Sequence, residues 1–533
     1  MMSLFKDFYV KVGRSPLYWV PLLVFSIVGY SFSIYNRTIH WDDFLKDVYN
    51  EIMLSNRWGM VLWGKLTGVM DLVPFVDRFL TLAFLVIASV LISILFYYLN
   101  QKKGEILSYT VLSSMMLTYP LINEIYEYTG ADLQFTGNLA LMLLAFIYLT
   151  LNIENPTSRT MAVACLLMIL PASSYEVALF SYLTLLCAVI LYKYNILSCT
   201  KISMKRWLWE NAYYLLPLVA AVIIRFIVAF VLREIYDLPF YSGGSTSISF
   251  ENTTITYILG SNGYRYFFAG LVYFPITVFV IALVIFAIYL IYLYIVERKF
   301  QIFGLGMLLV ISLFSLSIIQ GCCMQYRTAQ SLTVFVAFVA FIITRLEVRG
   351  RYQFLLHVLL LFLCWHQSVF LNRALALNNM RSNNEAASIR YVGCRLMSEF
   401  DTKKPIVLLT NEDYYGGYLG PWITKRAYAD DNTWNGRLFN SLTKKYLPEK
   451  YHHYKYYNSN IINAIGLGGT QRNTFAYYGF NLNIQDFSSV LSSIKDDKKR
   501  MLVENFYNKA GEVIPPLGIQ DMGECIFVNF DIK

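Results

Sequence analysis

The stretch that decides the fold is LYWVPLLVFSIVGYSFSIY, residues 17–35, which contains no charged residue. A membrane-spanning helix needs about 20 apolar residues, because the hydrocarbon core of a bilayer is about 30 Å thick. Lys6, Lys11 and Arg14 precede the stretch. Cations before a first span hold that end of a chain in the cytoplasm. No small-residue cleavage site follows, so we expect an uncleaved anchor helix with its N-terminus inside.

The composition of the whole chain is typical of a polytopic membrane protein. Of its 533 residues, 57% are hydrophobic and 15% are charged, whereas soluble domains are about 45–50% apolar and about 25% charged. The net charge of +9 would suggest nucleic-acid binding in a soluble protein. Here the positive residues cluster in short loops between apolar segments. Membrane topology therefore explains many of them, and no nucleic-acid partner is expected.

Further apolar segments along the chain predict about eleven transmembrane helices in all. They are expected near residues 17–35, 79–99, 106–121, 137–152, 160–172, 177–192, 212–232, 271–296, 302–320, 330–344 and 353–371. Pro171 is expected to end or kink the short span at 160–172. Cys165, Cys187 and Cys364 fall within spans and are expected to be buried apolar thiols.

The charges of the connecting loops predict the orientation. Every second loop is rich in Lys and Arg, as at Lys102-Lys103, Arg159, Arg298-Lys299 and Arg345. The intervening loops at 122–136 and 173–176 contain neither residue type. This alternation indicates an inside N-terminus. An odd number of spans then places residues 372–533 outside the cytoplasm.

Two domains are expected: a transmembrane domain at 1–371, with a first outward loop at 36–78, and a small soluble α/β domain at 372–533. The chain turns polar after residue 371, where Asn372, Asn378, Asn379, Asn383 and Asn384 are expected to mark a linker. Short apolar runs at 406–409 and 525–530 predict buried strands, and the spacing at 487–494 predicts a helix. Cys394 and Cys525 either form a disulfide in an oxidising compartment or stay free; the sequence favours neither.

The outward loops carry a series of acids next to aromatic residues. The first loop contains Trp41-Asp42-Asp43, the second contains Glu124, Glu127 and Asp132, and the third contains Glu176. Carboxylates accept hydrogen bonds from sugar hydroxyls, and aromatic rings stack on apolar sugar faces. The alternative is that the acids are simply solvated and the aromatics belong to an interfacial belt.

Arginines on the same side supply the opposite charge. Arg57 lies in the first loop, Arg327 lies near the same face, and Arg225 interrupts the apolar run at 220–228. An Arg at membrane depth costs about 2.5–3.5 kcal/mol on insertion scales and is a functional candidate by default. At the predicted depth of Arg225, a lipid phosphate is within reach. Snorkelling of the side chain to the headgroups is the structural alternative.

The layout resembles the GT-C superfamily of glycosyltransferases, in which an outward Asp-Asp pair follows the first helix. More narrowly, it is similar to the bacterial and phage-borne Gtr proteins that glucosylate O-antigen and convert serotype. Three segments carry this likeness: Trp41-Asp42-Asp43 followed by Asn56-Arg57-Trp58, Tyr119-Pro120 followed by acids to Asp132, and Pro515-Pro516-Leu517-Gly518 before the last strand. The second segment is less aromatic than the pattern, which leaves the roles of Glu124 and Glu127 open.

The resemblance implies transfer of one sugar, glucose, from a polyprenyl-phosphate sugar to a lipid-linked O-antigen or another surface glycan. The reaction would take place on the periplasmic side of a bacterial inner membrane. Asp42 would be the general base and Asp43 would orient the acceptor. The substrates would be bound by Trp41, Arg57, Glu124, Glu127, Asp132, Glu176, Arg225 and Arg327.

No nucleotide is needed for such a transfer, consistent with the lack of phosphate-binding loop motifs in the sequence. A divalent metal is compatible with the outward carboxylates, but no ligand spacing demands one. A companion flippase and a donor synthase are the expected protein partners.

Two other functions remain as alternatives. A transporter or flippase of lipid-linked sugar is expected to show paired repeats and charges near the membrane midplane. An O-antigen polymerase or ligase is expected to have one large loop between late spans. Here the charged candidates gather on one face, and the sizeable outward segments are the first loop and the C-terminal domain. Both features favour the glycosyltransferase.

Overall fold

The structure is a computed structural model that describes residues 1–36, 53, 56–68, 74–119, 132–175, 177–196, 204–237, 276–296, 298–320, 330–345, 350–409, 472, 475–476, 478–515 and 517–529. These residues are mostly helical and fall into two compact units. Of the described residues, those up to Leu375 belong to the first unit and those from Ala376 onward belong to the second.

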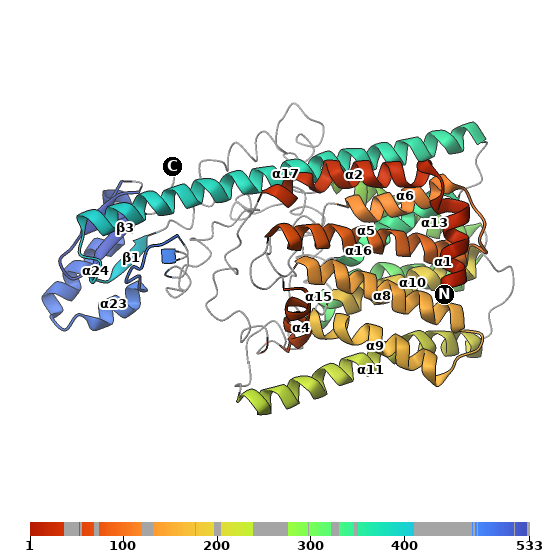
Figure 1. Ribbon diagram of the computed structural model, residues 1–533, viewed down its shortest axis with the longest axis horizontal. Helices are drawn as coiled ribbons and strands as arrows, with labels where there is room; N and C mark the ends of the chain where they lie inside the picture. The colour runs from red at the N-terminus through yellow and green to blue at the C-terminus, as the bar shows by residue number, and fades with distance from the viewer. Residues whose placement is uncertain are drawn as a thin grey trace. The chain divides into compact units, whose positions relative to one another are not determined.

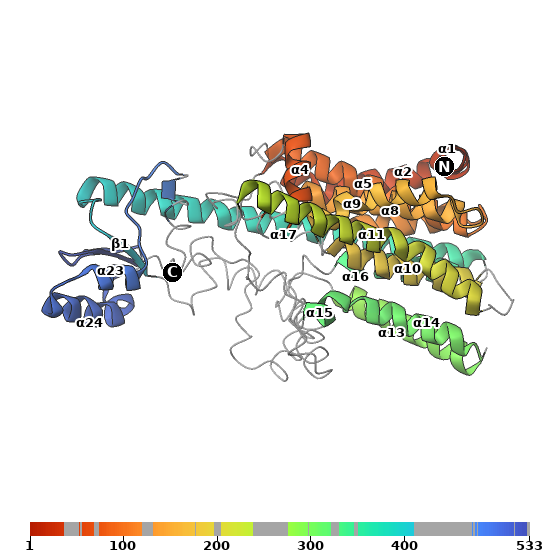
Figure 2. The ribbon, with the colours of Figure 1, turned by 90° about the horizontal axis from the view of Figure 1, so that it is seen from below.

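The first unit is a bundle of helices, most of which run side by side (Figure 1). Its elements are α1 (Met2–Phe8), the π-helix η1 (Tyr9–Gly13), α2 (Pro16–Tyr35), α4 (Trp58–Thr67), α5 (Pro74–Leu99), α6 (Ile106–Thr118), α8 (Asp132–Asn152), α9 (Ser158–Ser174), α10 (Val177–Ile196), α11 (Met204–Tyr236), α13 (Ile276–Ile295), α14 (Phe300–Ser312), α15 (Ser315–Gln320), α16 (Gln330–Thr344) and the first part of α17 (Gly350–Glu399). Figure 2 shows α13 and α14 as a pair on the outside of this bundle, beyond α10 and α16.

Six helices are long and apolar enough to cross a membrane. Within the described residues these are Pro16–Tyr35, Phe75–Leu99, Leu133–Asn152, Val177–Tyr194, Leu208–Tyr236 and Gly350–Arg373. Shorter apolar helices lie at Ile106–Thr118, Ser158–Ser174, Ile281–Ile295, Phe300–Ser312 and Gln330–Thr344. The protein is therefore a helical membrane protein, as its sequence predicts. Each predicted span overlaps one of these helices, but the number of crossings stays a prediction.

Hydroxyl groups connect the helices of the bundle where apolar packing alone would give no specificity. The hydroxyl of Tyr18 on α2 lies 2.7 Å from Ser113 Oγ on α6. The hydroxyl of Tyr30 donates to the carbonyl of Leu117, at 2.6 Å. Such interhelical hydrogen bonds contribute about 0.6–2 kcal/mol each in membrane proteins. They fix how α2 and α6 are aligned along their lengths.

Pro171 does not end its helix, which was one of the two outcomes predicted for it. It lies inside α9, which continues to Ser174. A proline lacks the N–H donor and its ring crowds the preceding turn, but Pro171 lies close to the end of α9. The hydroxyl of Ser174 donates to the carbonyl of Leu170, at 2.7 Å. The amide of Tyr175 donates to the Pro171 carbonyl, at 3.4 Å. These bonds satisfy the last carbonyls of the helix, so it runs on for three residues.

The predicted asparagine linker is also wrong, because residues 372–384 belong to α17. Asparagine is a weak helix former, but its cost is only a few tenths of a kcal/mol per residue. The segment contains neither proline nor glycine, and alanines and leucines separate its asparagines. Asn383 donates to Asn379 at 3.0 Å, one helical turn away. The division between the two units thus falls inside a continuous helix.

The second unit contains a small three-stranded sheet. Its strands are β1 (Ile406–Leu409), β2 (Ile519–Asp521) and β3 (Ile526–Asn529), in the order β1-β3-β2. β1 and β3 are parallel, and β2 and β3 are antiparallel. The strands predicted at 406–409 and 525–530 are confirmed.

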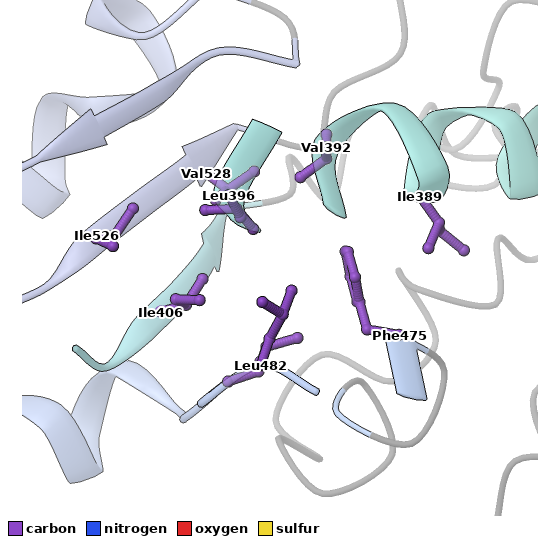
Figure 3. Packing of buried hydrophobic residues seen from close by; sticks show 9 residues of the cluster. Ile389, Val392, Leu396, Ile406, Phe475, Leu482, Ile526 and Val528 are labelled. Atoms are coloured by element: carbon purple, nitrogen blue, oxygen red, sulfur yellow. The ribbon is translucent and has the colours of Figure 1, made fainter. Parts of the chain in front are cut away.

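Alternate strand residues point to opposite faces of this sheet, as strand geometry requires. Ile406, Ile526 and Val528 pack on one face against Ile389, Val392, Leu396, Phe475 and Leu482, and Figure 3 shows this cluster. Val407 and Phe527 pack on the other face, against α23 (Phe487–Ser493) and α24 (Asp497–Val513). The predicted helix at 487–494 is confirmed as α23. A sheet packed on both faces explains why β1 and β3 are short apolar runs.

The cysteines of this unit form no disulfide. Cys394 is exposed, Cys525 is buried, and both thiols are free. Burial raises the pKa of the Cys525 thiol to about 11, which leaves it protonated at neutral pH. Of the two outcomes that the sequence left open, the structure shows free thiols.

Candidate functional site

The candidate site is built around the start of α4. Asn56 adopts a positive φ of 60°, which asparagine tolerates better than most residues. The chain reverses there, and Arg57 becomes the residue that precedes the helix. α4 ends at Gly68, which is also left-handed. Two tight turns thus delimit a ten-residue helix that carries an arginine at its N-terminus.

A glycine allows α4 to lie directly against the end of α9. A Cβ atom at Gly59 would lie 2.7 Å from Ser174 Oγ and 2.8 Å from the backbone carbon of Ser173. Real Cβ atoms essentially never come this close to another heavy atom, so only glycine fits without displacement. Gly59, Ser173 and Ser174 are all buried. This close contact holds Arg57 next to the C-terminal end of α9.

Two reciprocal hydrogen bonds join the same segment to α11. The guanidinium Nε of Arg225 donates to the carbonyl of Asn56, at 3.2 Å. The indole of Trp58 donates to the carbonyl of Arg225, also at 3.2 Å. Arg225 is only 4% exposed, whereas its neighbours Ile223 and Phe226 are 54% and 55% exposed. The arginine therefore points into the bundle, and its helix presents an apolar surface on the opposite side.

Arg57 is placed by an aromatic ring. Its guanidinium carbon lies 4.5 Å from the centroid of the Tyr175 ring, within the range of a cation–π contact. The Tyr175 ring in turn meets Phe135 edge-to-face, with centroids 4.7 Å apart. A guanidinium group presents its N–H donors in a rigid planar fork. Arg57 and Arg225, far apart in the sequence, thus meet around Asn56.

A polar layer continues from this point into the bundle. Trp63 donates to Asn138 Oδ1 at 2.9 Å, and Gln134 donates to the carbonyl of Met60 at 3.3 Å. Both partners on α8 lie near its N-terminal end, next to the predicted site residue Asp132 at its first position. A Cβ at Gly137 would touch the Trp63 ring at 3.1 Å. α4 is therefore fixed to α8 as well as to α9 and α11.

A buried acid and a buried base lie in the first turns of α5. Asp77 is 0% exposed and Arg78 is 2% exposed. An acid in the first turn interacts favourably with the positive end of the helix dipole. Burial of an ionisable pair is costly unless its members are hydrogen-bonded or paired. α5 therefore carries buried charged residues near its N-terminal end.

The structure brings together two of the residues predicted for the site, Arg57 and Arg225. Asp132 begins α8, and only its backbone is described. The remaining predicted residues lie outside the described residues: Trp41, Asp42, Asp43, Glu124, Glu127, Glu176 and Arg327. Their roles stay predictions.

Sequence reasoning missed Tyr175, Arg78 and the contacts of Trp58. Tyr175 directly precedes the predicted acid Glu176, so the sequence placed it near the site, but nothing in the sequence indicated its contact with Arg57. Arg78 was missed because it lies one residue before the apolar span predicted at 79–99, whereas α5 begins at Pro74. The pair Ser173-Ser174 was a usable signal, since small residues at a helix end allow close helix contact.

Metal binding and similarity to known proteins give no further assignment. Among the residues that the structure describes, no group of His, Cys, Asp or Glu side chains is arranged to hold a metal ion. Comparisons with protein-family models, with curated proteins and with solved structures gave no match.

Proposed function

We propose that this protein is a membrane glycosyltransferase that takes one sugar from a polyprenyl-phosphate donor and transfers it to a glycan acceptor. The proposed sugar is glucose, and the proposed acceptor is a lipid-linked O-antigen or another surface glycan. The class follows from the likeness of the sequence to the GT-C superfamily and its Gtr members. The proposed reaction takes place at one end of the helical bundle.

The observation that carries the proposal is the meeting of Arg57 and Arg225 around Asn56. The leaving group, a polyprenyl phosphate monoester, needs positive charge and directional donors, and arginine supplies both. The pair lies within a bundle whose neighbouring surfaces are apolar. A donor with a long isoprenoid chain is complementary to this arrangement, because its apolar tail matches the apolar surfaces and its anionic head matches the two arginines.

The chemical step is assigned to the acid pair of the first loop. Asp42 would accept the proton of the acceptor hydroxyl while that oxygen attacks the anomeric carbon, on the face opposite the phosphate. The bond between the anomeric carbon and the phosphate oxygen breaks, and the lipid phosphate leaves with the electron pair. Arg57 and Arg225 would neutralise the charge that develops there. Correct positioning of the two reactants supplies much of the rate enhancement.

The proposal includes a location and partners. We place the protein in a bacterial inner membrane, with about eleven spans, its N-terminus in the cytoplasm and residues 372–533 in the periplasm. A donor synthase and a flippase would deliver the polyprenyl-phosphate sugar to that side. A C-terminal phosphatase fusion is expected to be active, and a C-terminal cytoplasmic reporter is expected to be silent. The reverse pattern contradicts this topology.

The test of the donor site uses purified full-length protein in nanodiscs and polyprenyl phosphate as the probe. Arg225→Ala is expected to weaken binding by roughly ten- to hundredfold, since a hydrogen bond to a charged group contributes about 1.5–3 kcal/mol. Arg225→Lys keeps the charge but loses the fork, so it is expected to recover part of the affinity. Arg395→Ala, an exposed arginine paired with Glu399 at 2.8 Å, is the matched control and should bind normally. Unchanged affinity in both Arg57→Ala and Arg225→Ala would make these arginines structural.

A further inference from the structure

The N-terminal segment lies across one end of the bundle rather than along it. Figures 1 and 2 show α1 turned away from the direction of α2 and α5. Leu4, Phe8 and Val12 recur every four residues along α1 and η1 and are buried. This spacing gives an apolar face on a helix. The segment is therefore amphipathic and docks by that face.

An aromatic cluster holds the buried face in place. The Phe8 ring contacts Tyr18 and Tyr97 edge-to-face, with centroids 5.6 Å and 5.4 Å apart. Tyr109 adds a third ring at 6.4 Å. The three tyrosines come from α2, α5 and α6. The segment is thus packed against three helices of the bundle at once.

Polar bonds fix the segment further and neutralise its one acid. Asp7 accepts a hydrogen bond from the Tyr97 hydroxyl at 2.9 Å. The same carboxylate lies 3.5 Å from Lys11 Nζ and 3.6 Å from Lys102 Nζ. The indole of Trp19 donates to the carbonyl of Gly13, at 2.7 Å. These contacts anchor both ends of the segment to the bundle.

The opposite face of the segment combines exposed apolar side chains with cations. Met2, Tyr9 and Val10 are 87%, 54% and 44% exposed, and Lys6 lies among them and is also exposed. Arg14 follows at the end of the segment and is exposed as well. We call Met2, Lys6, Tyr9, Val10 and Arg14 the N-terminal outward face. Apolar and cationic side chains on one face of a surface helix are typical of helices that lie in a lipid headgroup region.

We propose that the N-terminal outward face binds the headgroups of anionic phospholipids. α2, which follows this segment in the chain, also exposes apolar side chains, since Leu17, Val20 and Leu23 are 57%, 54% and 55% exposed. A surface that begins where a membrane helix enters the bilayer meets headgroups first. Its cations complement anionic lipid, and its apolar side chains reach the acyl boundary. This inference does not depend on the proposed catalytic function.

The test compares purified full-length variants by native mass spectrometry of retained lipid, after incubation with phosphatidylglycerol or phosphatidylcholine. Each cation near an anionic surface is worth a factor of about five, so Lys6→Gln/Arg14→Gln is expected to lower phosphatidylglycerol affinity by roughly twenty- to thirtyfold at low salt. Phosphatidylcholine retention should not change. High salt should weaken the wild type toward the level of the variant.

Two control variants distinguish the effect of losing charge at the N-terminal outward face from misfolding and from a loss of charge elsewhere on the protein. Lys6→Arg/Arg14→Lys keeps both charges and should bind as the wild type does. Lys498→Gln/Arg500→Gln removes two exposed cations from α24 and should leave phosphatidylglycerol retention unchanged. Equal retention by Lys6→Gln/Arg14→Gln and the wild type would overturn the proposal. So would an equal loss of both lipids, or capture of an acidic protein in preference to phosphatidylglycerol.

Discussion

The two ends of the helical bundle use polar residues differently, and Figure 1 shows α4 and the N-terminus at these opposite ends. At the N-terminal end, Asn100 donates to the carbonyl of Lys103 at 2.6 Å and accepts from the Tyr192 hydroxyl at 3.0 Å. Arg345 reaches the same amide oxygen at 3.5 Å. These groups close the turn between α5 and α6, which contains left-handed residues at 101, 102 and 104.

At the α4 end, the hydrogen bonds and ring contacts gather two arginines instead. Arg225 is held by Asn56 and Trp58, and Arg57 is held over Tyr175. A buried polar cluster is therefore not by itself a functional site. One end joins side chains to the backbone of a turn, as architecture requires. The other brings two arginines from distant segments together, the arrangement that the proposed phosphate site requires. Changes at the α4 end should therefore alter activity, and changes at the N-terminal end should alter stability.

The largest effect is expected for Asp42→Asn. The substitution keeps the size of the side chain but removes the negative charge that lets it accept a proton. Transfer should therefore fall by at least a hundredfold, the typical contribution of a general base. Donor binding should persist, as measured with polyprenyl phosphate. Asp43→Asn is expected to cost less. If Asp43→Asn is inactive and Asp42→Asn is active, the two roles are reversed; if both are active, Asp132→Asn is the next variant to measure.

A change at the contact between α4 and α9 should affect both stability and donor binding. Gly59→Ala introduces a methyl group that overlaps Ser173 and Ser174, and overpacking of this kind costs about 1–3 kcal/mol. The melting temperature in detergent should fall, and polyprenyl phosphate should bind more weakly because Arg57 moves with the helix.

Gly304→Ala is the matched control for this variant. Gly304 lies in α14, and no heavy atom comes within 4 Å of an added Cβ there. Alanine is the better helix former by about 1 kcal/mol, so stability should be equal or higher and donor binding should be normal. Normal donor binding in Gly59→Ala as well would show that α4 does not position the site.

The turn at the N-terminal end gives the opposite expectation. Asn100→Ala removes the partner of Lys103, Tyr192 and Arg345, and unpaired buried groups cost about 1–3 kcal/mol. Thermal unfolding should shift to lower temperature. Transfer per folded molecule should equal that of the wild type. A specific loss of transfer without a loss of stability would break the proposed contrast between the ends.

The smallest effect is expected for Asp7→Asn, and it should depend on pH. The hydrogen bond from Tyr97, together with Lys11 and Lys102, holds the pKa of the Asp7 carboxyl below its usual range. A carboxyl with a depressed pKa in the folded protein stabilises it above the unfolded pKa of about 3.9, and this contribution is lost as pH falls through the folded value. The difference in melting temperature between wild type and Asp7→Asn should be constant from pH 5 to 8. It should close only below about pH 4. A difference that closed as pH rose would have the wrong sign.

The sequence predicted the long apolar helices and the short apolar strands because burial in lipid or in a core selects continuous apolar runs. The helix at Gln330–Thr344 and the strand at Ile406–Leu409 lie where they were expected. The asparagines of α17 and Pro171 of α9 misled the interpretation. In both cases the packing and hydrogen bonding of the whole helix outweigh a local preference of less than a few kcal/mol.

The site was predictable only in part, for a geometric reason. Charge in an apolar run identifies Arg225, and a cation in a polar loop suggests Arg57, without any knowledge of the fold. Their meeting depends on a left-handed turn at Asn56 and a side-chain-free contact at Gly59. Neither feature has a period that a sequence pattern reveals. Tyr175 was missed for the same reason, since its ring matters only through a residue distant in the chain.

The most direct test of the central claim is mass spectrometry of the O-antigen from cells with and without this gene, in the presence of the donor synthase and flippase. The account predicts that repeat units become heavier by one hexose when the gene is present. The gain should disappear in cells that carry Asp42→Asn or Arg225→Ala at normal protein levels. Identical O-antigen masses with and without the gene, with donor present on the periplasmic side, would contradict the account.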